Sequence, residues 1–197
     1  MEQNIVNFPD TQKIISLDKV KIGNTLPFAT ICGPCQIESK QHAIDICGAM
    51  VEITNELSIP YVFKASFDKA NRSSIKGARG VGLEKGMETF DEIKKLYPSL
   101  PIVTDVHEVW QCEEVAKHVD MLQIPAFLCR QTDLLVAAAK TGKVINIKKG
   151  QFLAPEDMKN AVQKCIDSGN DQVCLTERGT SFGYHTLIVD MTGFCTE

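Results

Sequence analysis

The chain has 197 residues, of which 44% are hydrophobic and 23% are charged, and its formal net charge is −4. This length and apolar content predict one globular domain over residues 1–197 with a sizeable core. The acidic balance argues against a nucleic-acid partner, and no run of about 18 apolar residues could cross a membrane. Residues 1–21 contain no basic region followed by an apolar run, so we expect a cytoplasmic protein without a membrane partner.

Short apolar runs alternate with amphipathic segments along the chain. Residues 13–22 alternate between polar and apolar side chains and predict a short N-terminal hairpin. The later apolar runs have the character of buried strands and cover residues 28–32, 61–65, 102–105, 121–124, 144–147 and 172–176. The first of them is expected to end at Gly33-Pro34. Helices are predicted over residues 40–57, 87–96, 109–118, 131–140 and 155–167. The alternation indicates an α/β protein with a parallel sheet.

Polar residues follow nearly every predicted strand. They are Cys35 and Glu38, Lys64 and Lys69, Asp105 and His107, Gln123, Lys148 and Lys149, and Glu177 and Arg178. An open doubly wound sheet gathers its ligand site around one switch point, whereas a barrel brings the carboxyl ends of all its strands to one mouth. The pattern therefore favours a TIM barrel. No glycine-rich dinucleotide or P-loop motif is present, which argues against those nucleotide-binding folds.

The segment from residue 63 to residue 74 is unusually rich in hydrogen-bond donors. It leaves an apolar strand and then presents two lysines, an asparagine, an arginine and several serines. With Lys148 and Arg178 at the same mouth, these groups would bind a polyanionic small molecule, such as one with two phosphates or with a phosphate and a carboxylate. Two alternatives are a solvated basic loop for residues 63–74 and a pair of surface cations for Lys148 and Lys149.

Eight cysteines are spread along the chain. A disulfide framework is not expected in a chain of this size without a leader, so we predict free thiols, several of them buried. Cys32 and Cys35 form a C-x-x-C motif, which would suit a redox pair or half of a zinc site. No second motif of that kind completes four zinc ligands.

Several long motifs carry a family resemblance. They are Gly-Pro-Cys-Gln-Ile-Glu-Ser at 33–39, Phe-Lys-Ala-Ser-Phe-Asp-Lys-Ala-Asn-Arg-Ser-Ser at 63–74, Thr-Asp-Val-His-Glu at 104–108, Leu-Gln-Ile-Pro-Ala-Phe-Leu-Cys-Arg-Gln-Thr-Asp-Leu at 122–134, Ile-Asn-Ile-Lys-Lys-Gly-Gln-Phe at 145–152 and Glu-Arg-Gly-Thr-Ser-Phe-Gly-Tyr at 177–184. From about residue 28 onward the chain resembles the 3-deoxy-D-manno-octulosonate 8-phosphate synthase (2-dehydro-3-deoxyphosphooctonate aldolase) family. The sister family that makes a seven-carbon product has Lys-Pro-Arg-Thr/Ser where this chain has residues 69–74, so the eight-carbon family is favoured.

The resemblance implies a (β/α)₈ barrel, usually a homotetramer, that condenses phosphoenolpyruvate with D-arabinose 5-phosphate and water and releases phosphate. Such a product enters lipopolysaccharide synthesis. By position, Lys69 would lie between the two substrates, and Lys148 would grip phosphoenolpyruvate together with Arg178. Lys64 is the third catalytic lysine that the resemblance implies, beside Lys69 and Lys148. The other substrate-binding positions that the resemblance implies are Asn71, Arg72, Ser73, Asp105, Gln123, Ala126, Arg130 and Gln151, with Arg130 reaching the site of a neighbouring subunit.

Cys35 occupies the position that is Cys in the metal-dependent branch of that family, so the resemblance implies a divalent metal. The other expected ligands belong to the last barrel strands, and the match to the family stops about two βα units before its barrel closes. We therefore expect a barrel that lacks the last two βα units and the remaining metal ligands. Two alternatives remain, an inactive remnant that still binds phosphoenolpyruvate through Lys148 and Arg178, and the seven-carbon sister synthase.

Overall fold

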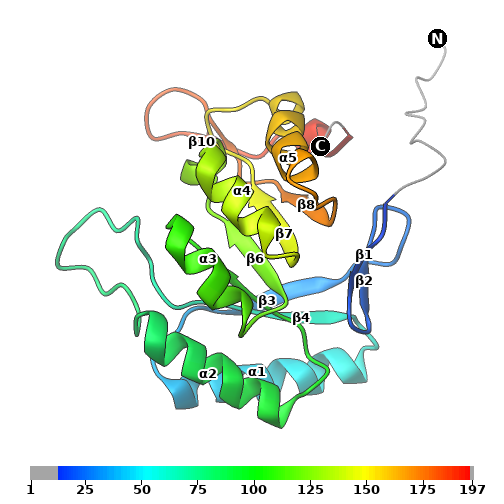
Figure 1. Cartoon of the computed structure of the whole chain (residues 1–197), viewed down its shortest axis with the longest axis vertical. Helices are drawn as coiled ribbons and strands as arrows, with labels where there is room; N and C mark the ends of the chain where they lie inside the picture. The colour runs from blue at the N-terminus through cyan, green and yellow to red at the C-terminus, as the bar shows by residue number, and fades with distance from the viewer. Residues whose placement is uncertain (1–12, 196–197) are drawn as a thin grey trace.

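The structure of the protein is a computed structural model that describes residues 13–195, with side chains through residue 193. Residues 1–12, which belong to the segment where no signal peptide is expected, lie outside the described residues. The thiol of Cys195 also lies outside them. The first described elements are β1 (Ile15–Leu17) and β2 (Val20–Ile22), which pair antiparallel as the predicted hairpin. Their buried side chains pack against one residue from each of four later strands, namely Val62, Val103, Met121 and Val144. The hairpin therefore covers the amino-terminal end of the sheet (Figure 1).

The central sheet has six parallel strands in sequence order. They are β3 (Thr30–Gln36), β4 (Tyr61–Ser66), β5 (Ile102–Asp105), β6 (Met121–Ile124), β7 (Val144–Lys148) and β8 (Val173–Thr176). Each strand pairs with the next along the chain, as in the wall of a (β/α) barrel. In the described part of the chain, β3 and β8 are each paired along one edge only. The predicted strand alternation and TIM-barrel-like α/β fold are confirmed.

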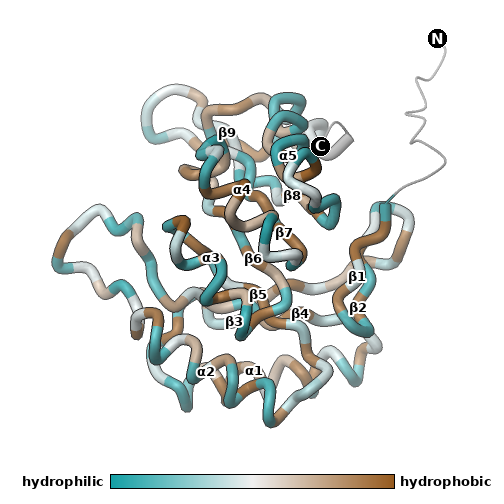
Figure 2. Tube along the Cα trace, viewed as in Figure 1, coloured by the Kyte–Doolittle hydropathy of each residue, from teal (hydrophilic) through white to brown (hydrophobic). Residues whose placement is uncertain are grey.

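The helices that connect the strands cover the outer face of the sheet. They are α1 (Lys40–Glu56), α2 (Leu83–Leu96), α3 (Val109–Ala116), α4 (Thr132–Lys140) and α5 (Met158–Asp167). Ser39 caps α1 by accepting the backbone N–H of His42 at 3.2 Å, and Glu108 begins α3 with a capping box. Apolar side chains from the helices and the outward face of the strands form one large core, which Figure 2 shows as brown segments along both layers. Burial of this shared face holds each helix on the sheet.

The first sheet strand corrects one boundary. It was expected to end at Gly33-Pro34, but β3 runs on to Gln36, with a register shift between Cys32 and Cys35. A Cβ atom at position 33 would lie 2.1 Å from the carbonyl oxygen of Lys64, so only glycine permits this approach to β4. Proline is tolerated at such a bulge because no ladder hydrogen bond is needed there.

Short elements complete the described chain. They are the 3₁₀ helices η1 (Ala126–Leu128), η2 (Pro155–Asp157) and η3 (Met191–Cys195) and the two-stranded pair β9 (Thr180–Ser181) and β10 (Leu187–Ile188). The β9–β10 pair follows the last sheet strand and was not predicted. Among the described residues, no helix combines the length and apolar character needed to span a membrane.

Candidate active site

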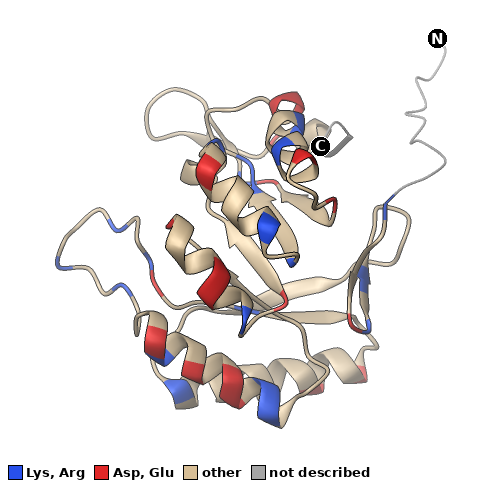
Figure 3. Ribbon diagram, in the orientation of Figure 1, with Lys and Arg blue, Asp and Glu red and all other residues tan. Residues whose placement is uncertain are grey.

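A cavity of about 490 Å³ lies at the carboxyl-terminal ends of the sheet strands. Its lining residues are Cys35, Lys64, Asp68, Lys69, Ala70, Asn71, Asp105, His107, Glu108, Pro125, Ala126, Phe127, Leu128, Lys148, Gln151 and Arg178. Figure 3 shows the basic residues of the long loop between β4 and α2, which supplies part of this wall. Residues from several strands and the loops after them thus meet at one mouth, as the strand-end pattern predicted.

Asp105, the last residue of β5, lies at the centre of the polar groups and is 5% exposed. Its two carboxylate oxygens accept hydrogen bonds from the hydroxyl of Ser66 and the amide nitrogen of Gln123. Lys64 Nζ lies 3.7 Å from Oδ2, and Lys148 Nζ lies 3.7 Å from Oδ1. Burial raises the pKa of Asp105, but both lysines and both hydrogen bonds outweigh it and lower the pKa to about 2. Asp105 is therefore ionised at neutral pH and holds one lysine on each oxygen.

Ser66 joins the lysines of β4 and its following loop to Asp105. Its hydroxyl accepts hydrogen bonds from Lys69 Nζ at 3.0 Å and Lys64 Nζ at 3.3 Å while it donates to Asp105. One donor and two lone pairs are all that a serine hydroxyl has, so its hydrogen-bonding capacity is full. Ser66 was not among the predicted site residues. Its position two residues after Lys64 on the same strand, and hence on the same face, is a signal that could have found it.

The loop after β4 is braced where it carries Lys69. The backbone N–H of Lys69 donates to Arg79 O at 2.6 Å, and that of Gly82 donates to Phe67 O at 3.0 Å. Arg79 Nε also donates to Asp68 Oδ1 at 2.8 Å. These cross-links close the base of a long loop, which limits the positions that the Lys69 side chain can take.

Gln123 belongs to a buried row of polar side chains beneath the cavity. Asn146 Nδ2 donates to Gln123 Oε1 at 3.0 Å, and Thr176 Oγ1 donates to Asn146 Oδ1 at 2.7 Å. Asp105, Gln123 and Asn146 are in register on three adjacent strands. Asn146 was not among the predicted site residues. An asparagine inside an otherwise apolar strand, in register with Gln123, is the signal for it.

Cys35 lies at the cavity wall with a backbone φ of 58°, in the left-handed region that non-glycine residues rarely adopt. Burial raises the pKa of its thiol, but a hydrogen bond with Lys69 and the charges of Lys69 and Lys64 outweigh that effect, so the pKa is lowered. Within residues 13–193, no group of three or more histidine, cysteine, aspartate and glutamate side chains could hold a metal ion. The described donors therefore do not make a metal site around Cys35.

The structure separates the predicted site residues into two groups. Those that line the cavity are Cys35, Lys64, Lys69, Asn71, Asp105, Ala126, Lys148, Gln151 and Arg178, while Gln123 lies beneath it. Arg72 and Ser73 are exposed outside the lining, and Arg72 donates to Gln36 Oε1 at 2.7 Å and Ala78 O at 2.9 Å. Arg130 lines a separate cavity of about 270 Å³ beside α5.

Lys148 and Lys149 are not a pair of surface cations. Lys148 lines the cavity, whereas Lys149 is 0% exposed. Lys149 Nζ donates to Gly179 O at 3.0 Å and lies 3.6 Å from Glu177 Oε2. Successive strand residues point to opposite faces, which sends the first lysine to the mouth and the second into the interior.

Parallel strands paired in sequence order, with a cavity at their carboxyl ends, are the arrangement of the (β/α)-barrel class of proteins. The family model described as the DAHP synthetase I family matches residues 7–197, and the chain belongs to that family. Relatives named "2-dehydro-3-deoxyphosphooctonate aldolase" include that of Rickettsia bellii (strain OSU 85-389), 60% identical over 182 residues, 92% of this chain and 66% of the relative. Those of Brucella anthropi and Pseudomonas entomophila are 58% and 56% identical, over 90% and 93% of this chain and 64% and 65% of their own lengths. The chain spans just under two thirds of these relatives.

Proposed function

We propose that this chain carries the active site for condensing phosphoenolpyruvate with D-arabinose 5-phosphate and water to give 3-deoxy-D-manno-octulosonate 8-phosphate and phosphate. The observation that carries the proposal is the convergence of Lys64, Lys69, Lys148 and Arg178 on one cavity. Asp105 is paired with two of these cations, and Arg178 makes no ion pair in the described part of the chain. Cationic side chains thus remain for two phosphorylated substrates. The name shared by the relatives supports the same reaction.

The proposed chemistry assigns a task to each cation. Lys148 and Arg178 bind the phosphate and carboxylate of phosphoenolpyruvate. Its C3 attacks the aldehyde carbon of the sugar, forming the new C–C bond, while Lys69 stabilises the oxygen that gains negative charge and supplies its proton. Water adds at C2 of phosphoenolpyruvate and returns one proton to Lys69. The bond between C2 and the phosphate ester oxygen then breaks, so that phosphate leaves with the hydroxyl proton and a C2 ketone remains. The ion pair between Lys64 and Asp105, at 3.7 Å, fixes the positions of these two charges beside the substrates.

The sugar phosphate is assigned to the loop after β4. Asn71 lines the cavity, and Arg72 and Ser73 follow it on the exposed side of that loop. Arg72 would leave Gln36 Oε1 and Ala78 O to reach a phosphate, a change that a flexible arginine on a loop permits. We further propose a cytoplasmic homotetramer, with residues 1–197 as one synthase domain and Arg130 turned toward a neighbouring subunit. Light scattering of the purified chain tests the oligomeric state.

A divalent metal at Cys35 also stays a prediction. Within the described part of the chain, no cluster of three or more histidine, cysteine, aspartate and glutamate side chains could complete its coordination. Metal content measured on the purified wild-type chain and on Cys35→Asn tests it. Equal metal content in the two proteins would remove Cys35 as a ligand.

The deciding experiment measures phosphate release with both substrates, with each substrate alone, and with and without added divalent metal. Release that requires both substrates is expected. Release that proceeds faster with erythrose 4-phosphate than with arabinose 5-phosphate would instead favour the seven-carbon reaction, to which the family description also applies. No release, combined with phosphoenolpyruvate binding in calorimetry, would identify a binding remnant. If the folded chain neither releases phosphate nor binds phosphoenolpyruvate, the proposal is overturned.

A further inference from the structure

The buried row beneath the cavity has one direction of hydrogen bonding. Thr176 donates to Asn146, Asn146 donates to Gln123, and Gln123 donates to Asp105. Cys174 adds a weaker donor, with its sulfur 3.7 Å from Asn146 Oδ1. The row runs from β8 through β7 and β6 to β5, so it crosses adjacent strands of the sheet wall.

The chemistry of the end groups determines this direction. An ionised carboxylate only accepts hydrogen bonds, so Gln123 must present its NH₂ group to Asp105 and its oxygen to Asn146. Asn146 must then present its own NH₂ group to Gln123 and its oxygen toward β8. Thr176 has a hydroxyl that can donate to that oxygen. If either amide turned over, two acceptors or two donors would face each other in the interior, which costs free energy.

We propose that Asn146 and Thr176 are positioning residues for the active site, which orient the Gln123 amide and thereby hold the Asp105 carboxylate between Lys64 and Lys148. This inference rests on the proposed function, because the two lysines matter as substrate-binding groups only if that function is correct. Neither Asn146 nor Thr176 lines the cavity, so each acts through Gln123 rather than on a substrate. Gln123 and Asn146 are 3% and 2% exposed, which keeps water from replacing a lost hydrogen bond in the row.

The charged and polar groups around Asp105 come from several strands, and they show by which contact Asn146 and Thr176 can influence its carboxylate. Its cations are Lys64 on β4 and Lys148 on β7, and Ser66 donates from β4. His107 after β5 and Cys35 on β3 also interact with its charge. Among the described residues of β6, only Gln123 hydrogen-bonds to the Asp105 carboxylate, through its side-chain amide. A change at Asn146 or Thr176 therefore reaches Asp105 through Gln123.

The test compares Asn146→Ala, Thr176→Val and the conservative Thr176→Ser in urea unfolding across acid pH. Asp105 has a folded pKa of about 2 against an ordinary value of 3.8. Its stabilisation is thus present above 3.8 and lost as pH falls toward 2. Asn146→Ala and Thr176→Val should make this acid loss smaller, and Thr176→Ser should retain the wild-type profile. Thr104→Val is the control, because Thr104 is buried on β5 and its hydroxyl has no hydrogen-bond partner.

A second arm places Asn146→Ala in an Asp105→Asn background, where it should no longer alter the acid profile. If Asn146→Ala instead lowers stability equally at every pH, the row is only structural and the inference is overturned. Phosphoenolpyruvate binding provides the functional readout, with the dissociation constant expected to rise roughly 3- to 10-fold for Asn146→Ala. If the wild type binds no phosphoenolpyruvate, the proposed function fails while the acid profile still decides whether the row positions Asp105.

Discussion

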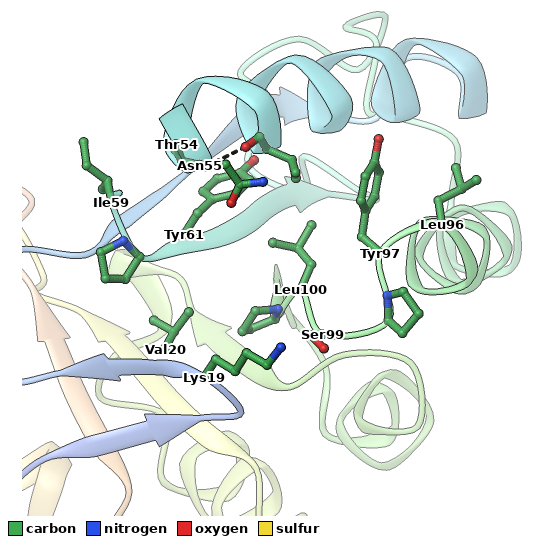
Figure 4. A pocket seen from close by; sticks show the side chains of 14 residues that line it. Lys19, Val20, Thr54, Asn55, Ile59, Tyr61, Leu96, Tyr97, Ser99 and Leu100 are labelled. Atoms are coloured by element: carbon green, nitrogen blue, oxygen red, sulfur yellow. Dashed lines mark hydrogen bonds between the residues drawn. The ribbon is translucent and has the colours of Figure 1, made fainter. Parts of the chain in front are cut away.

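Two cavities of nearly equal size lie at opposite ends of the sheet and differ in their chemistry. The cavity at the carboxyl ends of the strands, about 490 Å³, is lined by lysines, an arginine and carboxylates. The other, about 500 Å³, lies between the ends of α1 and α2 and the β1–β2 hairpin, and Figure 4 shows Val20, Tyr61, Tyr97 and Leu100 around it. Three prolines and one lysine, Lys19, also line it. Size therefore does not distinguish the two cavities, whereas the concentration of charge at the strand ends does.

The largest expected contrast is between one lysine from each cavity. Lys69→Ala should lower phosphate release by roughly 10²- to 10⁴-fold, because it removes the group proposed to stabilise and protonate the sugar oxygen. Lys19→Ala, at the opposite cavity, should leave the rate unchanged. Steady-state assays with both substrates measure this, and an undiminished rate for Lys69→Ala would remove Lys69 from the mechanism.

The buried charge of Asp105, at the carboxyl-end cavity, should contribute to the free energy of unfolding. Asp105→Asn should lose about 2 kcal/mol of unfolding free energy at neutral pH, since the folded pKa is about 2 against an ordinary 3.8. The loss should vanish as pH falls from 3.8 toward 2, where the wild-type carboxylate also becomes protonated. Asp45→Asn on the exposed face of α1 is the matched control, with an expected change within about 0.5 kcal/mol. A pH-independent loss in Asp105→Asn would contradict the assigned ion pairs.

At the opposite cavity, a hydrogen bond should affect stability without affecting catalysis. Tyr61 Oη donates to Cys32 O at 3.1 Å, so Tyr61→Phe should cost about 1 kcal/mol. Tyr97→Phe should cost less, because the Tyr97 hydroxyl makes no hydrogen bond within the described residues. Urea unfolding and phosphate release, measured on the same preparations, test both points. A fall in turnover for Tyr61→Phe at full folding would mean that the two ends of the sheet are coupled.

The smallest expected effect concerns thiol reactivity. Burial raises the pKa of Cys32, while the Lys69 hydrogen bond and nearby positive charge overcome burial and lower that of Cys35. Iodoacetamide near neutral pH should therefore modify Cys35 several-fold faster than Cys32, because the thiolate is the reacting form. Peptide mapping by mass spectrometry measures the two rates. Lys69→Met should reduce the difference, and faster modification of Cys32 would contradict the assigned environment of Cys35.

Much of the fold follows from local patterns in the sequence. Alternation in residues 13–22 predicts the β1–β2 hairpin, and short apolar runs separated by amphipathic segments predict the six sheet strands, because burial imposes those periods on neighbouring residues. The recurrence of polar groups after strands also predicts a shared mouth, since parallel strands end at the same edge. Lys64, Lys69 and Lys148 were placed in the site by this reasoning and by the family resemblance.

Contacts between distant residues were decided by the tertiary structure alone. The continuation of β3 past Gly33-Pro34 depends on the approach of Gly33 to Lys64 O, and the role of Asn146 depends on its register with Gln123. Arg130 lines another cavity, although Leu128, two residues earlier in the chain, lines the main one. Periodicity records which residues are buried, but register and side-chain direction determine which polar groups meet. Hydrogen bonds and ion pairs act over a few ångströms, so the pairs that define this site exist only once the strands are aligned.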